Sequence, residues 1–140
     1  MGHKGKYSKL IYFYTHLYRR GYCKIATLFE KANYLIFGAQ ISKTVKIGDN
    51  VYFPHYGLGV EIAPNTVIGD NCIIYQNCKI GNEHKESVVE DNVLIGAGAV
   101  IGPGQHIGAY SNVGANSVVN FDVTPHSTIV GNPGRVIKRG

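Results

Sequence analysis

Aliphatic residues recur at every sixth position through most of the chain. The series consists of Ile41, Ile47 and Phe53, then Ile62, Ile68, Ile74 and Ile80, and then Val89, Ile95, Ile101, Ile107, Val113 and Val119. Glycine often follows the aliphatic residue, and a small or β-branched residue stands four places after it. A period of six fits neither the 3.6-residue period of a helix nor the two-residue period of a plain strand. The pattern therefore predicts short strands that turn a corner once in each repeat.

The residues between the aliphatic positions are suited to corners. The triplets Gly48-Asp49-Asn50, Gly69-Asp70-Asn71 and Glu90-Asp91-Asn92 each end in an asparagine, a residue that tolerates positive φ at low cost. Three strands and three corners make a triangular turn of about 18 residues, and such turns stack so that strands pair in parallel. We therefore predict a mainly β protein, a parallel β-helix over residues 41–140.

The residues before the repeat have a helical pattern instead. Two apolar stripes at helical spacing predict two helices within residues 7–37, separated at Gly21 and ended by Gly38. The first stripe is Tyr7, Leu10, Ile11, Tyr14, Leu17 and Tyr18, and the second is Ile25, Leu28, Phe29, Ala32, Leu35 and Ile36. We expect both stripes to pack against the first turn of the β-helix. Residues 1–40 are thus predicted to be a short α-helical segment, separate from a β-helix domain over 41–140.

Charge is concentrated in this N-terminal segment. Residues 1–40 contain seven lysines and arginines and a single acidic residue, Glu30. A basic amphipathic helix can lie on an anionic membrane, so peripheral membrane contact through residues 1–40 is one alternative, and a solvated basic face is the other. The other hundred residues have no extended basic surface, which argues against nucleic-acid binding. No signal core precedes the repeat, so we expect a cytoplasmic protein.

The repeat is interrupted twice, and each interruption contains a histidine. The steps from Phe53 to Ile62 and from Ile80 to Val89 are each three residues longer than the repeat, and they include His55 and His84. His84 stands where the repeat calls for a small inward residue. Imidazole titrates near neutrality and can take a proton from a hydroxyl that attacks an acyl carbon. Both histidines are therefore candidate catalytic residues.

Four segments carry a resemblance to a known family. They are residues 53–62 (FPHYGLGVEI), 66–77 (TVIGDNCIIYQN), 93–99 (VLIGAGA) and 130–137 (VGNPGRVI). The chain resembles the hexapeptide-repeat acyltransferases, and among them the serine acetyltransferase family, with its short capsular and exopolysaccharide members as the most similar. This resemblance implies a left-handed β-helix, acetyl-CoA as co-substrate, no metal, and a homotrimer whose active sites lie between neighbouring subunits.

The resemblance also implies roles for individual residues. His55 matches the general base, and His84 would assist at the acceptor or at the tetrahedral intermediate. Acetyl-CoA would extend along the backbone of Gly96, Ala97 and Gly98, with Ala115, Arg135 and Lys138 reaching its pantetheine arm and phosphates.

Two departures from the family bear on the acceptor. Gln40 stands where the family has an aspartate that orients the base, so it would hold the ring without adding negative charge. Pro54 replaces an aspartate that helps to bind the ammonium group of serine. We therefore expect a sugar hydroxyl, on a saccharide or polysaccharide precursor, as the acceptor. Serine O-acetylation for cysteine biosynthesis is the alternative.

Two other classes of function are alternatives for this fold. A zinc hydrolase on this fold, like the γ-class carbonic anhydrases, needs three histidines that converge on one metal. Valine, at position 89, stands where a His-x4-His motif starting at His84 would place its second histidine. A non-catalytic scaffold is the other alternative, and it predicts that replacing His55 changes no measurable activity.

Overall fold

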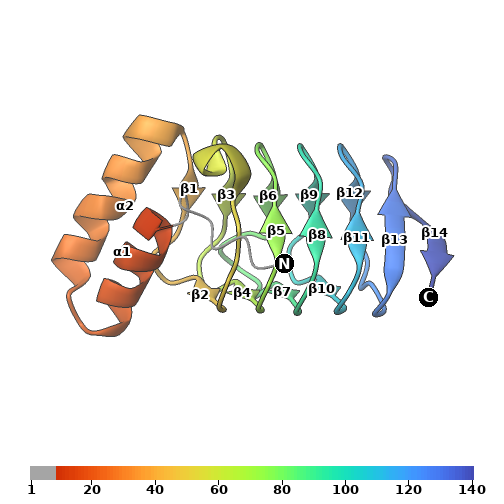
Figure 1. Ribbon diagram of the computed structural model, residues 1–140, viewed down its shortest axis with the longest axis horizontal. Coiled ribbons are helices and arrows are strands. Elements are labelled where there is room, and N and C mark those ends of the chain that lie inside the picture. Colours follow the sequence, from red (N-terminus) through yellow and green to blue (C-terminus); the bar gives the residue numbers. More distant parts are fainter. Residues whose placement is uncertain (1–8) are drawn as a thin grey trace.

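The computed structural model describes residues 9–140 as a β-solenoid with two helices at one end (Figure 1). The helices are α1 (Lys9–Arg19) and α2 (Cys23–Phe37), and they match the prediction except that Tyr7 lies outside the described residues. Within residues 9–140, neither helix is long and apolar enough to cross a membrane.

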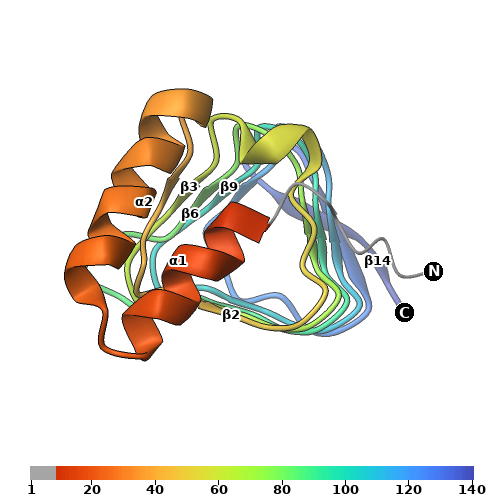
Figure 2. The ribbon, with the colours of Figure 1, turned by 60° about the vertical axis from the view of Figure 1, so that its left-hand side comes forward.

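Very short strands form three faces of a triangular coil (Figure 2). Face 1 contains β1 (Gln40–Ile41), β3 (Glu61–Ile62), β6 (Lys79–Ile80), β9 (Val100–Ile101) and β12 (Val118–Val119). Face 2 contains β2 (Lys46–Ile47), β4 (Val67–Ile68), β7 (Val88–Val89) and β10 (His106–Ile107). Face 3 contains β5 (Ile73–Ile74), β8 (Leu94–Ile95), β11 (Asn112–Val113), β13 (Ser127–Val130) and β14 (Arg135–Arg139).

The strand register shows where each turn is longer than the repeat. Ile62 pairs with Ile80, which is one plain turn of 18 residues, and the pairing is parallel. Ile41 pairs with Ile62 and Ile80 pairs with Ile101, so each of these turns contains three additional residues. All strand pairs are parallel except β13 with β14. The two predicted insertions are therefore real, and the regular coil resumes after each one.

The repeated aliphatic side chains fill the inside of the coil. Every aliphatic position of the series from Ile41 to Val119 is buried. The predicted corner residues Asn50, Asn71 and Asn92 have φ values of 56°, 57° and 58°, in the left-handed region. Asparagine is among the few non-glycine residues that adopt this conformation readily. The pattern of period six is thus explained by one inward side chain and one left-handed corner for each short strand.

Helix α1 closes the open end of the first turn. The side chains of Ile11 and Tyr14 are buried in the same core as Ile41. The hydroxyl of Tyr14 donates a hydrogen bond to the carbonyl oxygen of Ile41 at 2.7 Å, and that of Tyr12 donates to Gly48 at 2.9 Å. These contacts confirm the predicted cap, because they satisfy carbonyl groups at the exposed edge of the coil.

The prediction for α2 was wrong about which side of the helix is buried. Its buried residues are Ala26 and Asn33, whereas most of the predicted stripe faces solvent. Helical periodicity shows where the apolar side of a helix is, but it does not show which neighbour covers it. Here Ile11 and Tyr14 of α1 fill the end of the coil, and α2 packs through Ala26, Asn33 and the partly buried Phe29 and Phe37.

Candidate active site

The first inserted loop, residues 54–59, lies at the corner between faces 3 and 1 and holds His55. Its 3-10 turn η1 (Pro54–Gly57) contains three consecutive left-handed residues, with φ of 56° at His55, 63° at Tyr56 and 71° at Gly57. Left-handed backbone costs a non-glycine residue about 1–2 kcal/mol, and such strain concentrates at functional sites. We call this the first-insertion corner; it is the yellow turn in Figure 2.

The rest of the chain holds this loop firmly. Pro54 and Gly57 are buried, and the Tyr56 ring stacks on Phe37 of α2, with ring centres 5.2 Å apart. The backbone N–H of Asn77 in the next turn donates to the carbonyl oxygen of Leu58 at 2.9 Å. His55 itself is exposed. Its side chain is therefore presented to solvent from a backbone that is fixed on both sides.

The structure does not join Gln40 to His55. Within residues 9–140, no hydrogen bond links the two side chains, and the imidazole of His55 has no hydrogen-bond partner. The backbone N–H of Gln40 donates to the carbonyl oxygen of Val60 at 2.8 Å, which places Gln40 at the start of face 1. An orienting role for Gln40 remains a hypothesis.

The second inserted loop, residues 81–87, lies at the opposite corner of face 1, where the chain passes to face 2. The side-chain oxygen of Asn82 accepts hydrogen bonds from the backbone N–H groups of His84 and Lys85, at 3.0 and 3.1 Å. The His84 side chain is 77% exposed, and its Nε2 lies 3.7 Å from Oε1 of Glu83. We call this the second-insertion corner.

The predicted inward position of His84 is wrong, because its side chain is exposed. Ser87 takes that position instead: it is buried, and its Oγ accepts a hydrogen bond from the N–H of Gly104 at 3.0 Å. The three extra residues shift the inward position from the fourth to the seventh place after Ile80. His84 is part of the extra length and is therefore free of any packing role in the core.

The two candidate histidines therefore stand at opposite corners of face 1. At the rise of a β-strand, about 3.3 Å per residue, one face separates the two corners by about 15 Å. Two imidazoles at that separation cannot act on the same small acceptor within one chain. A site that uses both needs another copy of the chain.

A groove of about 380 Å³ lies over face 1, beside the second-insertion corner. Its lining includes Gln40, Glu61, Lys79, Glu83 and His84, and His55 is not part of it. Nζ of Lys79 lies 3.2 Å from Oε1 of Glu61, and both side chains are about half exposed. The groove thus offers carboxylates and an ammonium group within one small volume.

Sequence reasoning did not identify Glu61 and Lys79 as candidate site residues. The two side chains stand directly before an inward isoleucine in successive turns, and they are register partners on β3 and β6. That shared position is a signal the sequence does contain, because equal positions in neighbouring turns lie side by side. Two opposite charges at such positions predict an outward charged ladder.

The residues that the resemblance assigned to acetyl-CoA continue the first-insertion corner along the solenoid. From turn to turn, the backbone N–H of Gly98 donates to Gln76 at 3.0 Å, and that of Asn116 donates to Ala97 at 2.9 Å. Ala97 and Ala115 consequently lie two and three turns beyond His55 on the same corner. Ala115 is exposed and Ala97 is half-buried.

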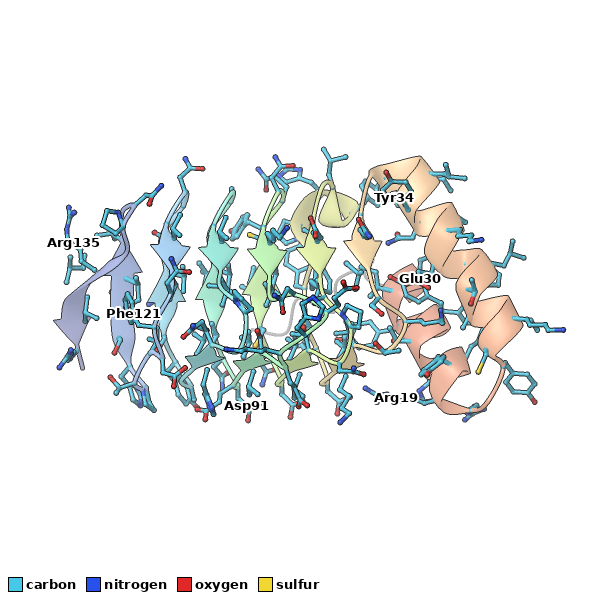
Figure 3. The ribbon with its side chains drawn as sticks, turned by 180° about the vertical axis from the view of Figure 1, so that it is seen from behind. Arg19, Glu30, Tyr34, Asp91, Phe121 and Arg135 are labelled. Atoms are coloured by element: carbon cyan, nitrogen blue, oxygen red, sulfur yellow. The ribbon has the colours of Figure 1, made fainter. Side chains whose placement is uncertain are left out.

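Arg135 lies at the far end of the solenoid, away from the helices (Figure 3). It pairs with Val130 at the start of β14, while Lys138 pairs with Thr128 farther along face 3. Five steps between stacked strands, each about 4.8 Å, separate Tyr52 beside the His55 loop from Arg135 on β14 by about 24 Å. An extended ligand that reaches from His55 to Arg135 would therefore follow the axis of the solenoid.

Two of the predicted glycines are explained by packing alone. A Cβ atom on Gly96 would lie 2.6 Å from the backbone nitrogen of Ala115 in the next turn, and Gly98 has a φ of 71°. Both positions need glycine whether or not a ligand binds there. The open backbone at this corner is therefore a consequence of the coil, and a ligand could use it.

The buried thiols do not form part of the site. Cys72 and Cys78 are buried and unpaired, and burial raises the pKa of each thiol to about 11. The thiol of Cys78 donates to the carbonyl oxygen of Gly96 at 3.0 Å. Both thiols therefore remain protonated at neutral pH and are poor nucleophiles. Among residues 9–140, no three histidine, cysteine or acidic side chains are grouped as metal ligands.

Comparison with known proteins gives the family of the repeat. Residues 86–120 match the family described as bacterial transferase hexapeptide (six repeats). The chain is 36% identical over 128 residues to serine acetyltransferase from Synechococcus elongatus, a match that covers 88% of this chain and 52% of the relative.

Solved structures of serine acetyltransferases share the fold. The Neisseria gonorrhoeae enzyme in complex with serine has a TM-score of 0.85 at 28% identity, covering 92% of this chain and 54% of that one. The soybean apoenzyme has a TM-score of 0.85 at 32% identity, covering 94% and 56%. A serine acetyltransferase in complex with CoA has a TM-score of 0.86 at 27% identity, covering 94% and 55%.

These matches confirm the predicted fold class, a left-handed parallel β-helix of hexapeptide repeats with two short N-terminal helices. The chain spans about half the length of the relatives that it matches. The matched proteins are serine acetyltransferases, so the expected similarity to capsular and exopolysaccharide enzymes finds no support among them.

Proposed function

We propose that this protein is an acetyl-CoA-dependent O-acetyltransferase that uses His55 as its general base. The observation that carries the proposal is the first-insertion corner itself. One continuous corner of the solenoid holds His55, the open backbone at Ala97 and the exposed Ala115, and Arg135 lies five strands away at the end of the same face. The similarity to serine acetyltransferases, including one in complex with CoA, supports the same assignment.

The chemistry is direct transfer. The imidazole of His55 takes the proton of the acceptor hydroxyl while that oxygen attacks the thioester carbonyl carbon. The tetrahedral intermediate then collapses, the C–S bond breaks, and the CoA thiolate leaves and receives the proton from the imidazolium. Backbone N–H groups near the corner would stabilise the oxyanion. No acyl-enzyme is needed: Cys72 and Cys78 lie in the core, and the exposed Cys23 begins α2, outside the first-insertion corner.

We further propose a homotrimer in which each site combines corners of two subunits. The separation of His55 and His84 across face 1 supports this arrangement, since a neighbour can bring its second-insertion corner against the first-insertion corner of the next copy. His84 of the neighbour would then bind the acceptor or the tetrahedral intermediate. The prediction of a trimer rests on the family resemblance and on this separation.

Serine is the first acceptor that we propose. The matched relatives are serine acetyltransferases, one of them in complex with serine. The groove beside His84 adds a physical reason, because Glu61 and Glu83 suit an ammonium group and Lys79 suits a carboxylate. A zwitterionic acceptor would therefore find both charges on this chain.

A sugar hydroxyl is the second candidate, and one specific observation favours it. Gln40 and Pro54 stand where the family resemblance predicts aspartates, so no carboxylate is supplied at either position. A neutral acceptor needs no partner for an ammonium group. Serine is favoured if the groove carboxylates bind the ammonium group of the acceptor. A sugar is favoured if the absence of the two aspartates determines specificity.

An acceptor panel tests the function. Purified protein is incubated with acetyl-CoA and serine, other hydroxy amino acids, or free and nucleotide-linked sugars, and the released CoA thiol is measured. The proposal expects thiol release above the rate of hydrolysis with at least one acceptor. Efficient transfer to sugars but not to serine would support the acetyltransferase activity and reject serine as the acceptor. No acceptor-dependent release from a folded protein that binds CoA would reject the function.

Mixed oligomers test the shared site. Subunits with His55→Ala and with His84→Ala are co-expressed with different affinity tags, and hybrids are purified through both tags. If each site takes one histidine from each of two subunits, hybrids regain about a third of the wild-type activity, because every mixed trimer has one of its three sites with both histidines intact. Hybrids no more active than either parent would show that both histidines act within one chain or that His84 has no role.

A further inference from the structure

One side of α2 is apolar, and most of it is exposed in the structure of residues 9–140. This outer face consists of Ile25, Leu28, Ala32, Leu35 and Ile36, which recur at intervals of three and four residues and so lie on one side of the helix. Leu28, Leu35 and Ile36 are 65%, 81% and 67% exposed. Figure 2 shows α2 at the outside of the molecule, beside α1, which crosses the open end of the coil.

Basic side chains border the outer face, and carboxylates are turned away from it. Lys24 and Lys31 are exposed on α2, Arg19 is the exposed last residue of α1, and the exposed Arg20 follows it. Among the described residues of the two helices, the sole acidic side chain is Glu30, which forms an ion pair with Lys43 of the solenoid at 3.2 Å. The surface around the apolar row is therefore cationic.

An apolar row bordered by basic side chains limits the kinds of partner that can bind this face. A second copy docked face to face would bring two sets of lysines together and lose stability from repulsion between like charges. A nucleic acid would pair its phosphates with the lysines but leave the leucine and isoleucine side chains in water. An anionic lipid surface satisfies both features, since acyl chains cover the apolar row and headgroups neutralise the lysines.

We propose that the outer face of α2 docks the protein on an anionic membrane surface. The helix would lie in the interface plane, with Leu28 and Leu35 inserted and Lys24 and Lys31 at the headgroups. Both helices cover one end of the solenoid (Figure 1). In the trimer proposed above, on which this step rests, three such faces would lie at the same end and bind together, which strengthens attachment.

Vesicle co-sedimentation of the full chain tests the proposal. The vesicles are phosphatidylcholine alone or phosphatidylcholine with phosphatidylglycerol, at low and at high salt. We expect binding to the anionic vesicles only, weakened by salt because the lysine term is screened. The double variant K24E/K31E should bind at least about tenfold more weakly, as each basic residue near such a surface contributes about 1 kcal/mol. L28S/L35S should lose about as much, through lost apolar burial.

Matched variants elsewhere control for charge and hydrophobicity. Lys46→Glu changes an exposed lysine on face 2, and Ile137→Ser changes an isoleucine that is 59% exposed at the opposite end of the solenoid. Both should sediment like the wild type. Transfer to a soluble acceptor, measured on all variants, separates failure of this proposal from failure of the proposed activity.

Three results would overturn the proposal. Equal binding to neutral vesicles, or none to anionic ones, removes the lipid surface as partner. If the wild type does not bind vesicles and L28S/L35S has a smaller molar mass than the wild type in light scattering, the outer face binds a second copy of the chain. Binding to RNA that K24E/K31E abolishes and L28S/L35S leaves unchanged assigns it to nucleic acid.

Discussion

The two inserted loops are the same kind of insertion, but they differ in how firmly the rest of the chain packs against them. Each adds three residues to a turn, each carries a histidine, and each stands at one end of face 1. The first loop buries Pro54 and Gly57 and stacks Tyr56 on the helical cap. The second loop is a turn held through Asn82, and the His84 side chain is 77% exposed.

This difference indicates how each histidine can work. The backbone at His55 is fixed before any ligand arrives, which lowers the entropic cost of placing a general base. His84 has little around it in its own chain, so a neighbouring subunit or a ligand must define its position. The first loop is thus a site built by the fold, and the second is one half of a site.

Replacing His55 should have the largest effect. His55→Ala removes the proposed base, so kcat should fall at least about 100-fold. Because the side chain is exposed, the melting temperature and the oligomeric state should stay the same. Thiol release at saturating acetyl-CoA measures the rate, and His16→Ala, on the exposed side of α1, is the control. An unchanged rate would remove His55 from the mechanism.

The second largest effect is expected on the free energy of unfolding, which substitutions in the first loop should lower more than substitutions in the second. Gly57→Ala puts a side chain on a buried left-handed residue, which costs about 1–2 kcal/mol of unfolding free energy. Glu83→Ala changes an exposed side chain of the second loop and should stay within about 0.5 kcal/mol of the wild type. Urea denaturation measures both. Equal losses in the two variants would contradict the description of the first loop as the more firmly packed one.

Much of the fold follows from sequence because the coil repeats one steric requirement. Each strand needs one inward aliphatic residue and one corner that accepts positive φ, and Ile68 and Asn71 show both in a single repeat. Extra residues were also detectable as longer steps between aliphatic positions. What the spacing did not give was the place where the register resumes, which is why Ser87 rather than His84 faces inward.

Contacts between elements could not be predicted in the same way. The outer face of α2 has the apolar spacing of a core helix, and Leu35 nevertheless faces solvent. Likewise, the sequence places His55 and Gln40 only 15 positions apart, yet no hydrogen bond joins them within residues 9–140. Such facts depend on which neighbours compete for the same space, and local patterns do not contain that information.

Replacing His84 should reduce activity less than replacing His55. If the neighbouring subunit supplies His84 to the acceptor, His84→Ala removes a positioning contact and should lower kcat/KM by about tenfold, the effect of losing about 1.4 kcal/mol. The acceptor KM should carry most of the change, and the KM for acetyl-CoA should not move. Steady-state kinetics with each substrate varied in turn measures this. A larger loss in the acetyl-CoA KM would place His84 with the cofactor instead.

The smallest effect is expected at Gln40, where the family resemblance predicts an aspartate. Gln40→Asp supplies the carboxylate that the first-insertion corner lacks, and a carboxylate near an imidazole favours the protonated ring. The rate should change by about threefold or less, and the half-maximal point of the pH–rate profile should move upward if the new charge reaches His55. Gln40→Glu, with a longer side chain at the same place, is the matched control. A profile that does not move in either variant would assign Gln40 to the groove with Glu61 and His84, and the first loop would then supply its base with no orienting partner from face 1.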